Sequence, residues 1–242
     1  MRRLVAVWFD GSGDDRWARM ARVLEHTARR HCPGWSVEVR RIDPPKRTGR
    51  TTTYEDNTAK LDEWAATVLS ARDGDELLLM DVDAMILGPL DGAWAGPLDF
   101  AYTVRDSPKA QFPINAGVVF ARISPEIKGF FLAWSEENRK MLARPGHHRE
   151  WQKRYGGINQ SALGLLIEQR KLGAELGLVG RELPCSEWNS EESTWERYQP
   201  GVTKIVHIKG QLRRIVLGLS RGTDIRIHHL ARLWRQLERE AA

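Results

Sequence analysis

Cysteine is scarce in this sequence, and long apolar runs are missing from it. The chain of 242 residues contains only two cysteines, Cys32 and Cys185. So few cysteines form neither a disulfide framework nor a metal-binding spacing, and they are typical of a reducing compartment, which predicts a cytoplasmic protein. No segment approaches the roughly 18 consecutive apolar residues of a membrane span. A transmembrane segment is therefore not expected.

Repeats and low-complexity segments are absent as well. The apolar stretch at the N-terminus ends at Asp10, which is too early for a signal peptide, so we expect it to form a first core strand. The composition is 41% hydrophobic and 29% charged, which allows a sizeable core. A length of 242 residues indicates one domain, or one large domain with a very small second one.

The excess of positive charge is concentrated at the C-terminal end. The net charge of the chain is +5, but residues 202–242 contain nine lysines and arginines against three acids. Such a basic segment is typical of a protein with a polyanionic neighbour, which can be nucleic acid, an anionic membrane surface or substrate phosphates. The alternative is a solvated basic helix, because Thr223–Arg239 has the apolar spacing of an amphipathic helix.

The first ninety residues alternate between strand and helix patterns. Short apolar or alternating runs predict strands at Leu4–Phe9, Ser36–Ile42 and Glu76–Leu87. Helical spacing of apolar residues predicts helices over Arg16–Arg30 and Asn57–Arg72. This order predicts an α/β fold with a central, mostly parallel sheet flanked by helices. Ligands of such sheets bind at the carboxyl ends of the strands.

Two aspartates interrupt the third of these strands. Asp81 and Asp83 stand at i and i+2, so they point to the same side of an extended chain. Carboxylates are rarely buried unless they are paired or bound to a cation. Their apolar approach therefore favours a divalent cation at the end of a central strand. The alternative is a pair of aspartates that opens a loop and is capped by backbone amides.

Two polar segments have less specific patterns. The turn-rich stretch that contains Lys46, Arg47 and Arg50 is expected to form a loop over the ligand-binding edge. The stretch 145–157 contains His147 and His148 and is predicted to be a solvated loop.

Four short motifs follow one another along the chain. They are Leu79-Met80-Asp81-Val82-Asp83, Asn115-Ala116-Gly117-Val118, Gly157-Ile158-Asn159-Gln160 and His207-Ile208-Lys209-Gly210. In this order they resemble the motifs of GT-A nucleotide-sugar glycosyltransferases, of the glycogenin and bacterial lipopolysaccharide galactosyltransferase type. The resemblance implies a Rossmann-like GT-A domain over residues 1–215, with residues 216–242 as a basic helical tail packed on it or extending it.

The resemblance implies a metal site. Asp81 and Asp83 match the Asp-x-Asp pair that binds Mn²⁺ or Mg²⁺ and, with Val82 between them, the donor ribose. His207 matches the histidine that completes the metal site. Two carboxylates and an imidazole suit such a cation, which would neutralise the charge on a nucleoside diphosphate leaving group.

The resemblance also implies where the rest of the donor binds. Lys209 and Gly210 match positions near the diphosphate, and Lys60 matches a basic residue near the donor. The Lys-Pro-Trp that often follows the histidine is absent, so Arg213 is the candidate for its phosphate contact. The nucleotide base is expected at the end of the first strand. The candidates there are Trp8, Phe9 and Asp10.

Three amide side chains match the residues that face the sugar. Asn115 matches the asparagine of the Asn-Ala-Gly turn, while Asn159 and Gln160 match a pair that is usually Asp-Gln. The asparagine at position 159 departs from that pattern and removes a charge near the sugar, so the usual donor preference of the family is not carried over to this chain. The resemblance implies retention of the anomeric configuration, although the residues themselves identify no nucleophile.

These features together predict a metal-dependent glycosyltransferase with a UDP-type donor. One acceptor hypothesis is a modified, hydroxymethylated DNA base, held through Lys46, Arg47, Arg50 and the basic tail. The other is a lipopolysaccharide or envelope glycan, with the tail on an anionic membrane. A metal-dependent phosphohydrolase or nuclease is the alternative enzyme class. A non-enzymatic nucleic-acid-binding module is a third interpretation, but it leaves the two aspartates without a role.

Overall fold

The structure is a computed structural model, and it describes residues 1–9, 15–46, 52–106, 112–220 and 225–242. Within these ranges, no helix combines the length and the apolar character needed to cross a membrane.

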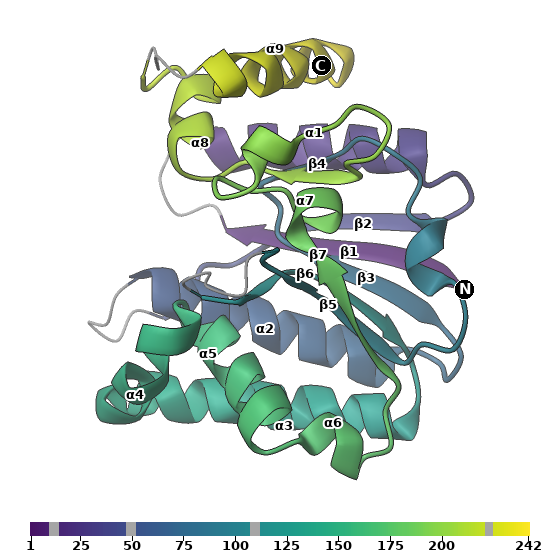
Figure 1. The fold of residues 1–242 in the computed structure, drawn as a ribbon, viewed down its shortest axis with the longest axis vertical. Helices are drawn as coiled ribbons and strands as arrows, with labels where there is room; N and C mark the ends of the chain where they lie inside the picture. The colour runs from purple at the N-terminus through teal and green to yellow at the C-terminus, as the bar shows by residue number, and fades with distance from the viewer. Residues whose placement is uncertain (10–14, 47–51, 107–111, 221–224) are drawn as a thin grey trace.

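Six strands form the central sheet (Figure 1). They are β1 (Arg2–Phe9), β2 (Ser36–Ile42), β3 (Glu76–Met80), β5 (Phe100–Val104), β6 (Ile114–Arg122) and β7 (Gly180–Pro184). Their order is β2-β1-β3-β6-β5-β7. β1 is parallel to β2 and β3, and β5 is parallel to β7, while β6 runs antiparallel to both of its neighbours. The predicted mixed, mostly parallel sheet is confirmed.

Helices cover both faces of this sheet. They are α1 (Arg16–His31), α2 (Thr52–Ser70), α3 (Pro125–Ala143), α4 (Pro145–Tyr155), α5 (Ile158–Gly164), α6 (Leu172–Glu175), α7 (Cys185–Trp188), α8 (Gly210–Val216) and α9 (Ile225–Glu240). Short 3-10 turns cover Asp91–Trp94 and Trp195–Arg197, and a π-helical turn covers Leu165–Gln169. Figure 1 shows α2 and α3 on one side of the sheet, α1 on the other side, and α9 outside α1.

The alternation of β3 explains this layering. Leu77 and Leu79 join the core that α2, α3 and α5 cover, whereas Leu78 and Met80 join the core that α1 covers. All four side chains are fully buried. Because helices cover both faces of the sheet, β3 must present apolar side chains to both faces.

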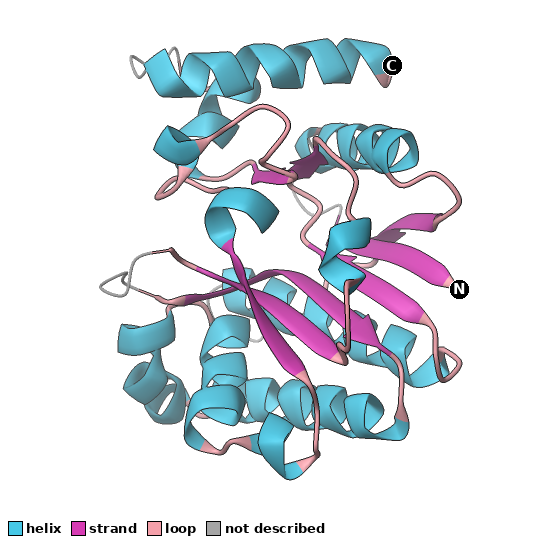
Figure 2. Ribbon diagram, turned by 45° about the vertical axis from the view of Figure 1, so that its right-hand side comes forward, coloured by secondary structure: helices cyan, strands magenta, loops and turns pink. Residues whose placement is uncertain are grey.

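The apolar run that follows the aspartates does not continue this strand. β4 (Ala84–Ile86) leaves the central sheet and pairs antiparallel with β8 (Ile205–His207). Figure 2 shows this small two-stranded sheet apart from the six-stranded one. The prediction of a single strand over Glu76–Leu87 is wrong in this respect, because a partner far along the chain supplies the hydrogen bonds of β4.

The C-terminal helix is part of a packed core. Leu230 and Trp234 of α9 are fully buried in a cluster with Met20 and Val23 of α1. An ion pair between Arg19 Nε and the Glu238 carboxylate, at 2.6 Å, joins the same two helices. Truncation before α9 would therefore expose apolar surface on α1. The exposed side chains of α9 include Arg232, Arg235 and Arg239.

The stretch predicted to be a solvated loop at 145–157 is mostly helix α4. Pro145 occupies its first turn, where its missing N–H costs nothing. His148 is buried, with its ring 4.8 Å from that of Tyr54, and His147 Nε2 is 2.6 Å from Glu137 Oε1. The prediction of a solvated histidine pair is therefore wrong, because these side chains contact α2 and α3.

Gly129 in α3 lies at a position with space for a larger side chain, and this can be tested by substitution. Nothing lies within 4 Å of the place that a β-carbon would take there, and the residue is in the helix interior. Because glycine loses more backbone entropy than alanine on folding, we expect Gly129→Ala to raise the free energy of unfolding by about 0.5–1 kcal/mol. Urea unfolding measures this change. A lower urea midpoint would contradict the open position of Gly129.

Candidate functional site

Asp81, Asp83 and His207 meet at the carboxyl edge of the central sheet. Asp81 follows β3 directly, and its backbone N–H donates to the Gly117 carbonyl at 2.8 Å. Asp83 precedes β4, and His207 pairs with Ala84 across the small sheet. His207 Nε2 is 3.1 Å from Asp83 Oδ1 and 3.5 Å from Asp81 Oδ2. The pairing of β4 with β8 therefore brings the histidine to the two aspartates.

These three side chains fit a divalent cation. One possible ligand atom from each of Asp81, Asp83 and His207 lies within 4.8 Å of the other two. Asp83 and His207 are buried, whereas the Asp81 side chain is 20% exposed. Carboxylate oxygens with one imidazole nitrogen suit Mn²⁺, and the carboxylates also suit Mg²⁺. The structure brings together the three residues predicted to hold the metal.

Two basic side chains contact the carboxylates. Lys60 Nζ donates to Asp81 Oδ1, and Arg213 Nη2 donates to Asp83 Oδ2. Burial alone would raise the pKa of Asp83, but the nearby His207 and Arg213 hold that pKa well below its usual range. The carboxyl group of Asp83 is therefore ionised at neutral pH, which is the form that binds a cation.

A glycine makes room for this cluster. A β-carbon at Gly117 would lie 2.8 Å from His207 Cε1, 2.9 Å from Asp81 Oδ2 and 3.1 Å from Asn115 Oδ1. Gly117 belongs to β6, where the chain is extended and does not need glycine for its backbone angles. Glycine is therefore needed at this position for space.

A cavity of about 490 Å³ lies beside the cluster. It is lined by Val7, Trp8, Phe9, Trp17, Thr52, Thr53, Asp56, Asn57, Lys60, Asp81, Val82, Asp83, Gly157, Asn159, Gln160, His207, Lys209 and Arg213. This volume lies within the range of pockets that hold small molecules and cofactors. The cavity thus unites the end of β1, the start of α2, the aspartates, the start of α5 and the start of α8.

Aromatic side chains form the wall near the first strand. Trp8 and Phe9 end β1, and Trp17 lies in the first turn of α1. The guanidinium carbon of Arg213 is 5.3 Å from the centre of the Trp17 ring. Trp17 ends the stretch Asp10–Trp17 that the resemblance matches to the nucleotide-base region, but it was not among the residues named as candidates there.

Two of the three predicted amides, Asn159 and Gln160, line the cavity, whereas Asn115 is fully buried and does not line it. Gln160 Nε2 donates to the carbonyls of Ile114 and Tyr155 at 2.9 and 2.8 Å, so both of its protons are used. Asn115 Oδ1 accepts a backbone N–H at 3.0 Å, and its buried Nδ2 has no hydrogen-bond partner among the described residues. Asn159 is buried and lines the cavity. The site therefore presents an oxygen from Gln160 and has an unused donor on Asn115.

Some predicted residues are not placed in the cavity. Asp10, Arg47 and Arg50 lie outside the described residues. Lys46 is exposed and Gly210 begins α8, and neither lines the cavity.

The first turns of α2 were missed by sequence reasoning. The predicted helix began at Asn57, but α2 begins at Thr52 and brings Thr52, Thr53 and Asp56 to the cavity. The spacing Thr52-x-x-Glu55 is a capping-box signal that would have placed the helix start correctly.

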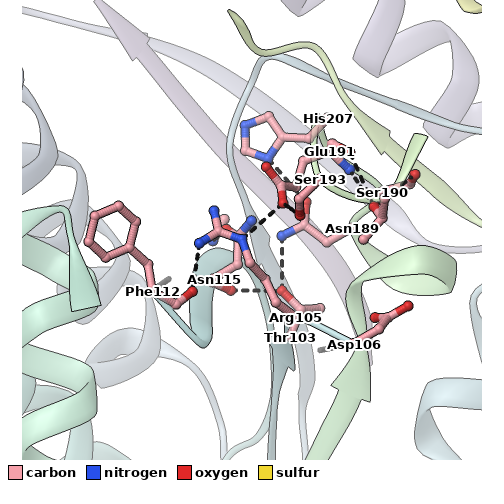
Figure 3. Close-up of polar contacts among 12 residues, drawn as sticks. Thr103, Arg105, Asp106, Phe112, Asn115, Asn189, Ser190, Glu191, Ser193 and His207 are labelled. Carbon is pink, nitrogen blue, oxygen red and sulfur yellow. Dashed lines mark hydrogen bonds and ion pairs between the residues drawn. The ribbon is translucent and has the colours of Figure 1, made fainter. Parts of the chain in front are cut away.

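A buried asparagine outside the predicted motifs contacts the histidine. Asn189 Oδ1 is 3.0 Å from His207 Nδ1, and Asn189 Nδ2 donates to Thr103 Oγ1 at 2.9 Å (Figure 3). The sequence gives no local signal for this contact, because Asn189 follows a short helix far from both partners.

Comparisons with known proteins agree on the fold. No protein-family model matches the sequence, and no curated protein matches it. One similar solved structure is a glycosyltransferase involved in the glycosylation of the major capsid of PBCV-1, at 12% identity and a TM-score of 0.59, over 95% of this chain and 98% of that one. Another is the galactosyltransferase LgtC in complex with donor and acceptor sugar analogs, at 13% identity and a TM-score of 0.56, over 99% and 96%.

A third similar structure is the glycosyltransferase GlyE of Streptococcus pneumoniae TIGR4. It is 13% identical with a TM-score of 0.58, over 99% of this chain and 62% of that one. At such identities the likeness is one of fold. The resemblance that the four motifs predicted is confirmed at this level: the chain has the GT-A fold of nucleotide-sugar glycosyltransferases.

Proposed function

We propose that this protein is a metal-dependent glycosyltransferase that moves a sugar from a UDP-type nucleotide-sugar donor to a hydroxyl acceptor. The observation that carries the proposal is the meeting of Asp81, Asp83 and His207 beside a cavity of about 490 Å³ in a GT-A fold. The similar structures of this fold are glycosyltransferases, and one of them holds donor and acceptor sugar analogs.

The proposed role of the cluster is to hold Mn²⁺ or Mg²⁺ against the donor diphosphate. A divalent cation there supplies neutralisation of the charge that develops on the leaving group. Lys209 and Arg213 line the same cavity, which supports the proposal that they donate to phosphate oxygens. Lys60 beside Asp81 adds a further positive charge at this end of the cavity.

The proposed sugar site is the part of the cavity lined by Asn159 and Gln160. Asn159 lines the cavity, whereas Asn115, which the resemblance matches to a sugar-facing residue, is fully buried outside that lining and has an unused N–H donor. Because Gln160 donates both Nε2 protons to backbone carbonyls, its amide oxygen is the group proposed to face the sugar. An oxygen there stabilises the positive charge that develops on the sugar ring as the glycosidic bond breaks. We include retention of configuration in the proposal, because the resemblance to the galactosyltransferase type implies it.

The proposed base site is the aromatic wall. Trp8, Phe9 and Trp17 line the cavity and supply aromatic rings for stacking of a nucleobase, and Val82, between the two aspartates in sequence, lines the same cavity. Asp10, which lies outside the described residues, is proposed from the resemblance as a further contact to the base.

The proposed acceptor is a polyanion, because exposed basic side chains lie on α9 and at Lys46. Arg232, Arg235 and Arg239 of α9 are exposed, as is Lys46. A polyanionic acceptor such as hydroxymethylated DNA suits such a surface. A lipopolysaccharide or envelope glycan is the alternative acceptor, and it is one arm of the test.

A donor panel tests the activity. Purified protein is incubated with nucleotide sugars and Mn²⁺, with hydroxymethylated DNA or glycan acceptors, and nucleoside diphosphate release is measured. We expect one donor to be turned over, and EDTA to lower its rate by at least about 10²-fold, because the cation supplies several kcal/mol of charge stabilisation. Excess Mn²⁺ should restore the rate.

The outcomes separate the enzyme classes. A folded protein that releases no nucleoside diphosphate from any donor, with any acceptor, would contradict the transferase proposal. Metal-dependent cleavage of DNA or of phosphate esters, without use of a nucleotide sugar, would instead identify a nuclease or phosphohydrolase.

A further inference from the structure

Thr103, Asn189 and His207 form a buried chain of hydrogen bonds behind the candidate metal site (Figure 3). Thr103 Oγ1 lies 2.7 Å from the Asn115 carbonyl oxygen, and Asn189 Nδ2 lies 2.9 Å from Thr103 Oγ1. Asn189 Oδ1 lies 3.0 Å from His207 Nδ1. Thr103, Asn189 and His207 are each at most 1% exposed, so these hydrogen bonds are shielded from bulk solvent.

The Asn115 carbonyl oxygen is the first acceptor in this series of hydrogen bonds, and it fixes the direction of each bond that follows. A backbone carbonyl only accepts, so the single hydroxyl proton of Thr103 points to Asn115. The Thr103 oxygen then accepts from Asn189, which turns the amide oxygen of Asn189 toward His207. Because that oxygen also only accepts, His207 must carry a proton on Nδ1.

The consequence lies on the other side of the imidazole ring. With its proton on Nδ1 held by Asn189, His207 presents Nε2 to Asp81 and Asp83, at 3.5 and 3.1 Å. Nε2 is the nitrogen within reach of a shared cation. The chain of hydrogen bonds therefore sets both the orientation and the protonation pattern that a metal-binding histidine requires.

We propose that Asn189 is a positioning residue of the metal site and that Thr103 fixes its amide. The inference rests on the proposed metal-dependent function and adds a residue outside the four motifs. The backbone also holds Asn189 in place, because its N–H donates to the Cys185 carbonyl at 3.0 Å. The next residue, Ser190, accepts the backbone N–H of His207 at 2.8 Å. These backbone hydrogen bonds thus fix the position of Asn189 relative to His207.

Binding of Mn²⁺ tests the proposal without reference to turnover. Free Mn²⁺ is followed by electron paramagnetic resonance in a titration of the full chain, with Mn²⁺ alone and with UDP present. Asn189→Leu keeps the size of the side chain but removes the acceptor. We expect it to weaken Mn²⁺ binding by about 10–100-fold, the effect typical of losing the outer partner of a ligating histidine.

A conservative variant and a matched control separate positioning from stability. Asn189→Asp keeps an acceptor oxygen for His207, so we expect Mn²⁺ binding within about threefold of wild type. Asn138 is also fully buried and donates to Thr58 Oγ1 at 2.7 Å. Asn138→Leu should therefore lower stability but leave Mn²⁺ affinity unchanged.

Thr103 gives a second route to the same conclusion if Asn189→Leu does not fold. Thr103→Ser keeps the hydroxyl and should bind Mn²⁺ as wild type does, whereas Thr103→Val should bind it several-fold more weakly. Equal affinities of wild type and a folded Asn189→Leu, or of the Ser and Val variants, would overturn the inference. Equal losses in the Asp and Leu variants would do the same.

The proposed function fails in a different way. If the wild-type protein binds no Mn²⁺, with or without UDP, both the metal-dependent function and this inference are overturned. If wild type binds Mn²⁺ and turns over a donor while Asn189→Leu is unaffected, only the inference is lost.

Discussion

Asp83→Asn is expected to abolish metal-dependent donor turnover, with a fall in kcat/KM of about 10³-fold or more. The Asp83 carboxyl is buried, and His207 and Arg213 hold its pKa below the usual range, so the wild-type group is charged at neutral pH. Asparagine keeps the size of the side chain but removes that charge. The proposed cation then loses one of its two carboxylate ligands.

The fold should survive this change. Arg213, which donates to Asp83, has a side chain that is 32% exposed, so it can turn to solvent when its partner becomes neutral. The backbone carbonyl of Asp83 still accepts the N–H of Ile208 at 2.6 Å. We therefore expect the variant to unfold cooperatively and to lose less in stability than in activity.

Thermal shift provides the second readout for Asp83→Asn. With Mn²⁺ at about one hundred times its Kd, ligand binding adds about 2.7 kcal/mol to wild-type stability, which corresponds to a rise of about 5–10 °C in Tm. The variant should show almost no rise. Asp62→Asn is the matched control, because Asp62 accepts from Ser135 and Arg139 on the surface of α2 and α3. A rise in Tm with Mn²⁺ as large in Asp83→Asn as in wild type would contradict the assignment of Asp83 as a metal ligand.

Gly117→Ala is expected to weaken Mn²⁺ binding and donor turnover by about 10²-fold. The new β-carbon would lie 2.8 Å from His207 Cε1 and 2.9 Å from Asp81 Oδ2. Real β-carbons do not approach other heavy atoms so closely, so at least one of these two groups must move. Both belong to the proposed metal site, and either movement changes the distance between ligands.

Stability should respond much less than binding to Gly117→Ala. Alanine fits the extended backbone of β6 and restricts the unfolded chain, which stabilises, whereas the crowding costs about 1–3 kcal/mol. Mn²⁺ titration and donor kinetics measure the first effect, and urea unfolding measures the second. Gly129→Ala is the control, since the same substitution meets nothing within 4 Å there. Wild-type Mn²⁺ affinity in Gly117→Ala would show that the ligands lie elsewhere.

Local patterns were enough to predict several elements. The strand predicted at Ser36–Ile42 has those bounds in the structure, and the helix predicted over Arg16–Arg30 ends one residue later. In both, the apolar spacing and the turn residues beside it act within a few positions. The helix α4 was missed because its polar sequence has little apolar periodicity, and contacts with α2 and α3 bury His148.

The sequence by itself determined that Asp81 and Asp83 follow a strand buried on both faces, and that three further motifs come after them in the order of a GT-A fold. The resemblance also matched His207 to the third metal ligand, but only the tertiary structure shows how His207 meets the aspartates and which side chain supports it. His207 reaches Asp83 across 124 positions because β8 pairs with β4 instead of the central sheet. Asn189 contacts His207 through the same non-local packing. Such contacts depend on strand pairing between distant segments, which no local spacing encodes.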